Sequence, residues 1–221
     1  MYNNNGDCMN ILFDLDGTLS DPYQGISKGF IYCLDKLGME IPDNNVLKSF
    51  IGPPLLDTFL NYYHMDQDEA DYAVKLFREY YEPTGKYENS LYPGIKETLI
   101  DLSIKHDLYL CTGKPQKVAE DITGHFEIDC LKGIYGSIDY VRMSKAEIIS
   151  CCINEEHLNK KECIMVGDRK HDIIGAHEVG IPCIGVLYGY GSIDEFQQYE
   201  CDYVVKDLSK LKELEKKFIH D

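Results

Sequence analysis

The chain has 221 residues, of which 44% are hydrophobic and 27% charged, a composition typical of a folded globular protein rather than a disordered one. Its net charge of −16 argues against a nucleic-acid partner, because phosphate backbones are bound by basic surfaces. No apolar run approaches the roughly 20 residues that cross a bilayer, and residues 1–7 do not resemble a secretory signal, so we expect a cytoplasmic protein without membrane contact.

The chain contains nine cysteines, an odd number, and no Cys-x-x-Cys pair. Several of them lie inside apolar runs that resemble strands. We therefore interpret them as small buried side chains in a reducing compartment. A metal site or a redox switch is the alternative interpretation.

Residues 9–13 form the first apolar run and predict a short buried strand that ends at Asp14. From residue 20 to residue 90 the spacing becomes helical, with a break at residues 51–54. The expected helices carry Ile26, Phe30, Leu34 and Leu37 (ending at Gly38), then Leu55, Phe59 and Tyr63, and then residues 70–81. We see no strand pattern in this segment, which predicts an all-helical insert after the first strand.

From residue 91 onward, strand-like and helix-like segments alternate. The expected strands are 108–111, 133–137, 163–166, 183–187 and 203–205, and the expected helices are 95–104, 117–122, 146–153, 173–179 and a closing helix with Leu208, Leu211, Leu214 and Phe218. Repeated β-α units imply a parallel sheet with helices on both faces. We predict the α/β class, with a core of residues 1–19 and 91–221 and a helical insert at 20–90.

Two carboxylates follow the first strand directly, at Asp14 and Asp16, and Gly17 and Thr18 come next. Ligands bind outside the carboxyl ends of parallel strands, so this pair is expected at the mouth of a site. Like charges close together require a cation or a shared proton. A plain turn is the alternative interpretation of Asp-x-Asp-Gly taken alone.

Polar motifs also follow two later strands. Residues 112–115 read Thr-Gly-Lys-Pro, and residues 167–172 read Gly-Asp-Arg-Lys-His-Asp, with Lys145 between them. An anionic substrate would be repelled by the net charge of the chain unless local positive charge attracts it. Candidates for that local charge are Lys114, Lys117, Lys145, Arg169, Lys170 and a bound divalent cation.

In this order the motifs resemble those of the haloacid dehalogenase superfamily, whose members are mostly phosphatases. The resemblance covers nearly the whole chain. It implies a Rossmann-like parallel-sheet core and a helical cap inserted after the first motif. The acid at Asp16 favours phosphoryl transfer, because the dehalogenase members lack an acid at this position.

The resemblance also implies roles for individual residues. Asp14 would be the nucleophile that forms an aspartyl-phosphate, and Asp16 the general acid and base. Thr112 and Gly113 would bind phosphate oxygens, together with Lys145. The implied Mg²⁺ site uses Asp14, Asp16 through its backbone carbonyl, Asp168, and Asp172, which would orient a metal-bound water or Lys145.

Lys145 has a sequence signal of its own. Ser144 and Glu147 have the spacing of a capping box, so Lys145 falls in the first turn of a helix, where positive charge is unfavourable. A nearby anion would explain this placement. A solvated surface lysine is the alternative, and Lys132 is the second candidate for the active-site lysine.

The expected cap should choose the substrate. Gly52, in a loop between cap helices, and Arg78, the single arginine of residues 20–90, are the candidate substrate-binding residues. Phosphoglycolate phosphatases and β-phosphoglucomutases often follow the motif lysine with Pro-x-Pro, whereas Ala146 and Glu147 follow Lys145 here. Residues 167–176 and 185–191 instead resemble the 5′-nucleotidase-like members.

We therefore predict a Mg²⁺-dependent phosphomonoester hydrolase acting on a small phosphorylated metabolite, either a nucleoside monophosphate or phosphoglycolate. A sugar-phosphate mutase or phosphotransferase and a catalytically idle phosphate-binding module are the alternatives. We expect a monomer or a weak homodimer.

Overall fold

The computed structural model describes residues 8–138 and 141–210. The chain divides into two compact units, a core unit of Met1–Leu19 and Leu91–Asp221 and an insert unit of Ser20–Ser90. Each unit is described by itself below. Most of the predicted closing helix falls on residues 211–221, which lie outside the described residues.

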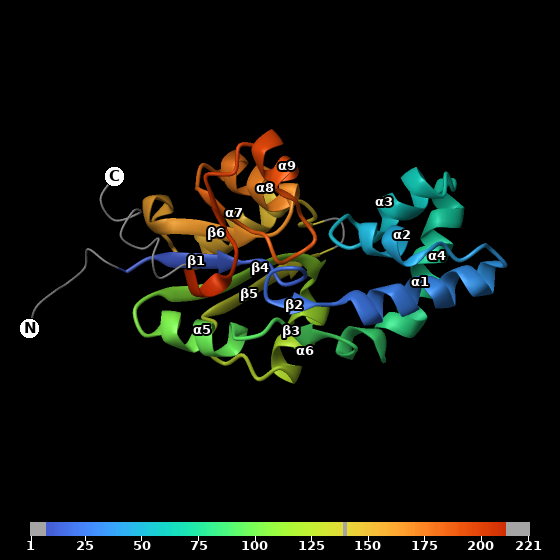
Figure 1. Cartoon of the computed structure of the whole chain (residues 1–221), viewed down its shortest axis with the longest axis horizontal. Coiled ribbons are helices and arrows are strands. Elements are labelled where there is room, and N and C mark those ends of the chain that lie inside the picture. The colour runs from blue at the N-terminus through green and yellow to red at the C-terminus, as the bar shows by residue number, and fades with distance from the viewer. Residues whose placement is uncertain (1–7, 139–140, 211–221) are drawn as a thin grey trace, which may run out of the picture. The chain divides into compact units, whose positions relative to one another are not determined.

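The core unit is built on one six-stranded sheet in the order β5-β4-β1-β6-β7-β8 (Figure 1). All neighbouring strands in it run parallel. The strands are β1 (Asn10–Phe13), β4 (Asp107–Pro115), β5 (Gly133–Ser137), β6 (Cys163–Gly167), β7 (Cys183–Val186) and β8 (Tyr203–Val205). The predicted α/β class with a parallel sheet is confirmed.

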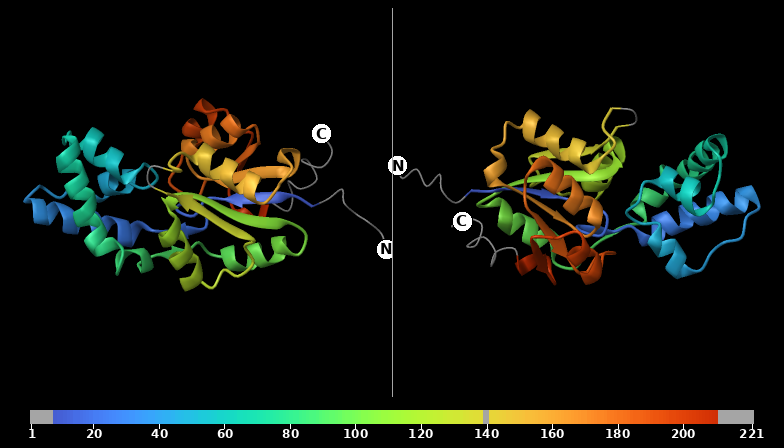
Figure 2. Two further views of the ribbon diagram at one scale, coloured as in Figure 1. Left: turned by 180° about the vertical axis from the view of Figure 1, so that it is seen from behind. Right: turned by 90° about the horizontal axis from the view of Figure 1, so that it is seen from above.

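Helices cover both faces of this sheet (Figure 2). They are α5 (Ile95–Ser103) and α6 (Gln116–His125) on one face, and α7 (Lys145–Glu155), α8 (Lys170–Val179) and α9 (Ile193–Gln198) on the other. Short 3₁₀ turns at Lys160–Glu162 and Leu208–Lys210 complete the described part of the unit. Strands connected in this way are apolar on both faces, since neither face meets water.

The central strands show this burial residue by residue. In β4, Tyr109 and Cys111 pack in one cluster with residues of α7 and α8, such as Ile148 and Ile173. The intervening Leu108 and Leu110 are completely buried as well, and successive side chains of a strand point to opposite faces. The nine cysteines are all free thiols, and Cys33, Cys111, Cys152, Cys163 and Cys183 are buried.

Two elements of the core unit differ from the sequence-based prediction. The predicted strand 108–111 was too short, because β4 runs to Pro115 with a shift in its pairing to β5 between Cys111 and Pro115. Helix α9 was not predicted at all. Its first turn is stabilised by the side chain of Ser192, which accepts a hydrogen bond from the backbone N–H of Glu195 at 3.1 Å.

The insert unit consists mainly of helices. They are α1 (Tyr23–Leu37), α2 (Asn44–Ser49), α3 (Leu55–Asp57), a π-helical turn (Thr58–Tyr62), α4 (Gln67–Tyr81) and a 3₁₀ turn (Gly85–Tyr87). Aromatic rings form the centre of its core: the ring of Phe30 lies 4.8 Å from Phe50, 5.5 Å from Phe59 and 5.1 Å from Phe77. Phe30 of α1 thus contacts the end of α2, the π-helical turn and α4. Ring pairs at such separations attract one another and stabilise this packing.

The prediction of an insert without strands is wrong at its two ends. Two-residue strands, β2 (Ser20–Asp21) and β3 (Ser90–Leu91), pair with each other at the boundary of the insert. Helix α2 was also missed, since it has only one fully buried residue, Leu47, and so no apolar periodicity. Asp43 caps it by accepting hydrogen bonds from the backbone of Asn45 and Val46 at 2.8 and 3.0 Å.

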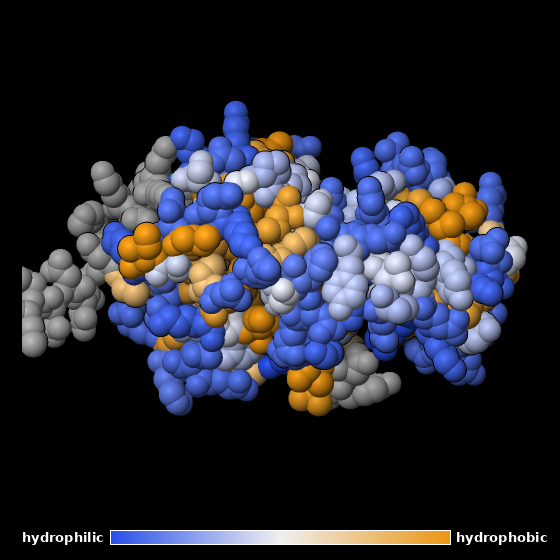
Figure 3. Space-filling model, turned by 90° about the horizontal axis from the view of Figure 1, so that it is seen from below, coloured by the Kyte–Doolittle hydropathy of each residue, from blue (hydrophilic) through white to orange (hydrophobic). Residues whose placement is uncertain are grey.

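The surface in Figure 3 is mainly hydrophilic, with apolar side chains in separate patches. Among the described residues, no helix combines the length and the apolar character needed to cross a membrane.

Candidate active site

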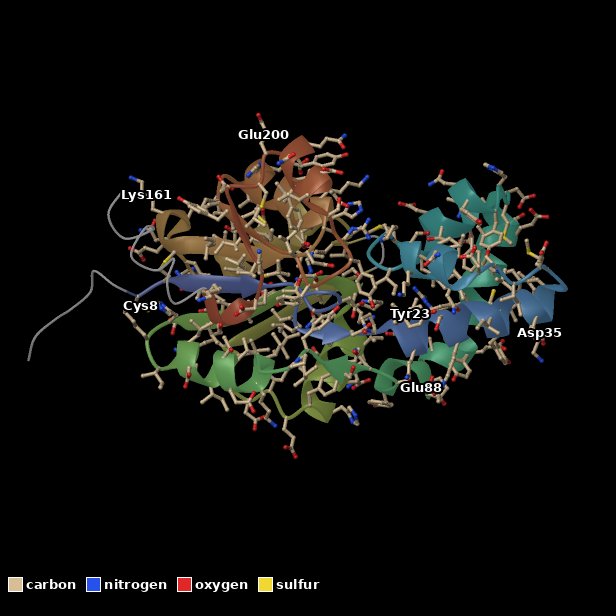
Figure 4. All side chains as sticks on the ribbon, viewed as in Figure 1. Cys8, Tyr23, Asp35, Glu88, Lys161 and Glu200 are labelled. Carbon is tan, nitrogen blue, oxygen red and sulfur yellow. The ribbon has the colours of Figure 1, made fainter. Side chains whose placement is uncertain are left out.

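The predicted motif residues of the core unit gather at the carboxyl ends of the parallel strands. β1 lies between β4 and β6, so Asp14, Thr112 and Asp168 come from three adjacent strands. Cys8 and Lys161, labelled in Figure 4, precede β1 and β6 and mark the opposite side of the sheet, where the amino ends of the strands lie. Functional sites of open α/β sheets lie outside the carboxyl ends of the strands.

Three carboxylates form the centre of the site. One oxygen from each of Asp14, Asp168 and Asp172 lies within 4.8 Å of the others. Burial, with the negative charges of Asp172 and Asp14 nearby, raises the pKa of Asp168 well above its usual range. Burial likewise raises the pKa of Asp172 to about 6, although Lys145 opposes this shift. The cluster therefore needs positive charge to stay ionised.

Lys145 supplies part of that charge. Its Nζ lies 2.8 Å from Oδ1 of Asp14 and 2.8 Å from Oδ1 of Asp172, and it donates to the carbonyl of Cys111 at 3.0 Å. Burial alone would lower the pKa of Lys145, but the two carboxylates raise it above its usual range. The lysine is thus held as a cation in contact with both acids.

The local fold explains how Lys145 reaches this position. It is the first residue of α7, and Ser144 and Glu147 form the predicted capping box at that helix end. The second candidate, Lys132, instead pairs with Asp107 at 3.0 Å, at the amino end of β4. The solvated-surface interpretation is wrong for Lys145, whose side chain is only 8% exposed.

Asp16 lies apart from the three clustered carboxylates. Its Oδ2 contacts Nζ of Lys114 at 2.7 Å. Burial raises the pKa of Asp16 above its ordinary value, against the opposing effect of Lys114. The Asp16 carboxylate therefore has a different charged partner from Asp14, which contacts Lys145.

Thr112 and Gly113 lie inside β4 rather than at its end. The Thr112 side chain is buried and its Oγ1 accepts a hydrogen bond from the backbone N–H of Lys114 at 3.3 Å. The following helix begins at Gln116, so the prediction of a strand that stops at residue 111, directly before Thr112, is wrong. The pairing of β4 with β5 shifts between Cys111 and Pro115, and Lys114 in this irregular segment contacts Asp16.

The loop after β7 completes the surroundings of Asp168, a role that the sequence did not reveal. The backbone N–H of Tyr190 donates to Oδ2 of Asp168 at 2.7 Å. A side chain at Gly17 or Gly189 would collide with the Asp168 carboxylate. The three glycines at 185, 189 and 191 were the available signal, because glycine permits such close backbone approach.

The two predicted substrate-binding residues of the insert unit lie on separate elements. Gly52 is exposed, in the loop between α2 and α3, and has a φ of +106°, a conformation that favours glycine. Arg78 is half-buried on α4.

The chemistry of the acidic cluster fits a divalent cation. Oδ1 of Asp168 is buried and accepts no hydrogen bond, so one of its oxygens is available as a ligand. Four carboxyl groups (Asp14, Asp16, Asp168 and Asp172) face two ammonium groups (Lys114 and Lys145), so the acids outnumber the lysines by two. Carboxylate oxygens with room for water are the usual ligands of Mg²⁺.

A model of the haloacid dehalogenase-like hydrolases matches residues 11–186. The chain therefore belongs to this family. The predictions of family, of fold class and of a hydrolase enzyme are confirmed.

Individual relatives are similar over most of the chain. The chain is 44% identical over 208 residues to a 5′-nucleotidase of Pseudomonas aeruginosa, covering 93% of this chain and 94% of the relative. It is 34% identical over 187 residues to tyrosine-protein kinase PtkA of Mycobacterium tuberculosis, covering 83% of this chain and 64% of that one. The crystal structure of a predicted phosphatase from Clostridium acetobutylicum has a TM-score of 0.88 at 34% identity, covering 97% of this chain and 99% of the other.

Proposed function

We propose that the protein is a Mg²⁺-dependent phosphomonoester hydrolase that acts on a small phosphorylated metabolite through an aspartyl-phosphate. The observation that carries this proposal is the pairing of Asp14 with Lys145 at 2.8 Å beside two further carboxylates, while Asp16 stands apart with Lys114. Two acids two residues apart thus have different surroundings. Different surroundings allow them different roles.

In the proposed reaction, a carboxylate oxygen of Asp14 attacks phosphorus and the bond between phosphorus and the ester oxygen breaks. Asp16 donates its proton to that leaving oxygen. Asp16 then accepts a proton from the water that attacks the aspartyl-phosphate, which releases inorganic phosphate and restores Asp14.

Lys145 holds the nucleophile in place and balances the charge of the incoming phosphoryl group, and Asp172 fixes the position of Lys145. Asp14, Asp168, Asp172 and the backbone carbonyl of Asp16 would hold the metal. When bound, Mg²⁺ would neutralise charge on the phosphoryl oxygens.

The substrate we propose is a nucleoside monophosphate or a small phosphorylated acid such as phosphoglycolate. The 44% identity to a protein named 5′-nucleotidase supports the first. A phosphotransferase is the second candidate, because a relative with 34% identity is named a kinase. The full set of acids and lysines at the site disfavours an idle phosphate-binding module.

A screen of phosphorylated metabolites tests the proposal. We expect phosphate release from one or more small esters, with one oxygen of the released phosphate derived from water. The measurement is the mass of the phosphate after turnover in ¹⁸O-labelled water. Loss of the phosphoryl group to an added sugar or peptide hydroxyl, without labelled phosphate, would instead show a transferase.

Substitution of Gly175, which packs against Lys145, should reduce turnover although residue 175 is not expected to contact the substrate. A Cβ at Gly175 would lie 2.7 Å from Cβ and Cγ of Lys145, closer than van der Waals contact allows. We expect Gly175→Ala to displace the ammonium group and to lower kcat by about 10²-fold, since small misplacements in an active site have effects of this size.

Gly124→Ala is the matched control for this change. Gly124 is also helical, but a Cβ there meets no atom within 4 Å. Its replacement should raise the free energy of unfolding by about 0.5–1 kcal/mol and leave kcat unchanged. Equal kcat values for both variants would contradict the inference that Lys145 needs the space left by Gly175 to reach its position.

The insert unit should determine which substrates are preferred. We expect Gly52→Val, which strains a backbone with a φ of +106°, and Arg78→Ala to change kcat/KM unequally across a panel of metabolites. Hydrolysis of p-nitrophenyl phosphate should change less. A uniform loss on all substrates, or none, would show that these residues do not select the substrate.

A further inference from the structure

Lys114 lies beside Asp16 and extends the site beyond the three clustered carboxylates. Its Nζ is 2.7 Å from Oδ2 of Asp16, and its side chain is only 6% exposed. Its backbone N–H is bonded to Oγ1 of Thr112, the predicted phosphate-binding hydroxyl. The irregular end of β4 therefore directs an ammonium group to the proposed general acid.

The two buried lysines serve different parts of the site. Lys145 contacts the proposed nucleophile, Asp14, and is anchored by Asp172 and by the carbonyl of Cys111. Lys114 contacts Asp16 instead. One lysine thus lies on the side of the attacking atom and the other on the side of the proton donor.

The position of the proton donor shows which part of a substrate Lys114 would meet. A general acid must lie within hydrogen-bond distance of the atom that it protonates. In the proposed reaction this atom is the ester oxygen of the leaving group. Because the ammonium group of Lys114 contacts the Asp16 carboxylate at 2.7 Å, a leaving group whose ester oxygen is bonded to Asp16 would bring its first carbon atoms close to Lys114.

We propose that Lys114 is a specificity residue that favours phosphomonoesters with a carboxylate on the carbon that bears the ester oxygen. Short phosphorylated hydroxy acids have this arrangement, whereas a nucleoside 5′-monophosphate presents an uncharged sugar carbon there. A cation in a site that excludes water attracts such a carboxylate more strongly than one in solvent. The net charge of −16 repels a substrate with additional negative charge, and a nearby cation offsets part of that repulsion.

This inference rests on the proposed phosphatase function, and a pair of matched esters tests it. 2-Phosphoglycolate and ethyl phosphate differ only in the replacement of the carboxylate by a methyl group. We expect Lys114→Met to lower kcat/KM for 2-phosphoglycolate at least about tenfold more than for ethyl phosphate, as expected when one member of a buried charge pair is removed. Lys114→Arg, which keeps the charge, should retain most of the preference.

Lys117→Met is the control for the loss of one positive charge. The sequence made Lys117 a candidate for local positive charge at the site, but its side chain is 79% exposed and pairs with Asp121 on the surface of α6. It should leave the ratio of the two kcat/KM values unchanged. Lys114→Gln provides the same comparison as Lys114→Met if the methionine variant does not fold.

An equal loss on both esters would overturn the inference, because it would show that Lys114 acts only through Asp16. An unchanged ratio, or the same change in Lys117→Met, would also overturn it. If the wild type hydrolyses other esters but does not prefer 2-phosphoglycolate to ethyl phosphate, the phosphatase proposal stands and only the inference fails.

If the wild type hydrolyses no ester, the proposed function fails. The role of Lys114 can then be tested by calorimetry, by comparing the affinities of 2-phosphoglycolate and ethyl phosphate for the wild type and for Lys114→Met. Selective loss of 2-phosphoglycolate affinity in the variant would support the inference. Equal affinities in both proteins would refute it.

Discussion

Replacing Asp14 with asparagine should abolish turnover while the protein remains folded. An amide cannot form the acyl-phosphate, so kcat should fall by on the order of 10⁴-fold or more, as is usual when a nucleophile is removed. Lys145 would keep its contact with Asp172, so the site should retain its shape. The measurements are phosphate release and the thermal unfolding temperature.

Asp107→Asn is the control for this substitution. Asp107 begins β4 at the amino edge of the sheet and pairs with Lys132, so the same chemical change is made far from the site. It should leave kcat unchanged.

Borohydride reduction during turnover should also convert residue 14 of the wild type to homoserine, detectable by mass spectrometry. A folded Asp14→Asn variant with substantial activity would rule out this residue as the nucleophile.

Removal of divalent metal should have a similarly large effect. The site holds two more acids than lysines, and an anionic substrate would add further negative charge. We expect exhaustive treatment with EDTA to abolish activity, Mg²⁺ to restore it and Ca²⁺ not to restore it. Calcium accepts more ligands with looser geometry, which would allow the nucleophilic carboxylate to bind through both oxygens and lose its attacking position.

Metal binding can be measured apart from activity. Asp168→Asn should weaken Mg²⁺ binding in calorimetry, because Asp168 has a buried oxygen without a hydrogen bond. Asp107→Asn should bind Mg²⁺ as the wild type does. Full activity after chelation, or unchanged Mg²⁺ affinity in Asp168→Asn, would contradict the proposed metal site.

Much of the fold could be predicted because it depends on local patterns. Apolar runs of strand length, separated by helical periodicity, predicted the α/β class, and the expected strands 133–137 and 203–205 agree with β5 and β8. Helices α2 and α9 were missed because they are short, with six residues each, and bury little apolar surface. Their capping residues, Asp43 and Ser192, were the remaining local signals.

The sequence by itself determined the family, through motifs of few residues at strand ends, and the order of strands and helices along the chain. A motif specifies residue types, but it does not specify which charges come into contact. The sequence favoured Lys145 as the active-site lysine and kept Lys132 as the second candidate. The tertiary structure decided between them, since Lys132 precedes β5 and pairs with Asp107, whereas Lys145 lies beyond the carboxyl end of β5 and contacts Asp14. The pairing of Lys114 with Asp16 and the contact of Tyr190 with Asp168 likewise depend on strands that are adjacent in space but distant along the chain. Such contacts depend on the order and register of the sheet, which are set by long-range packing and have no local signature.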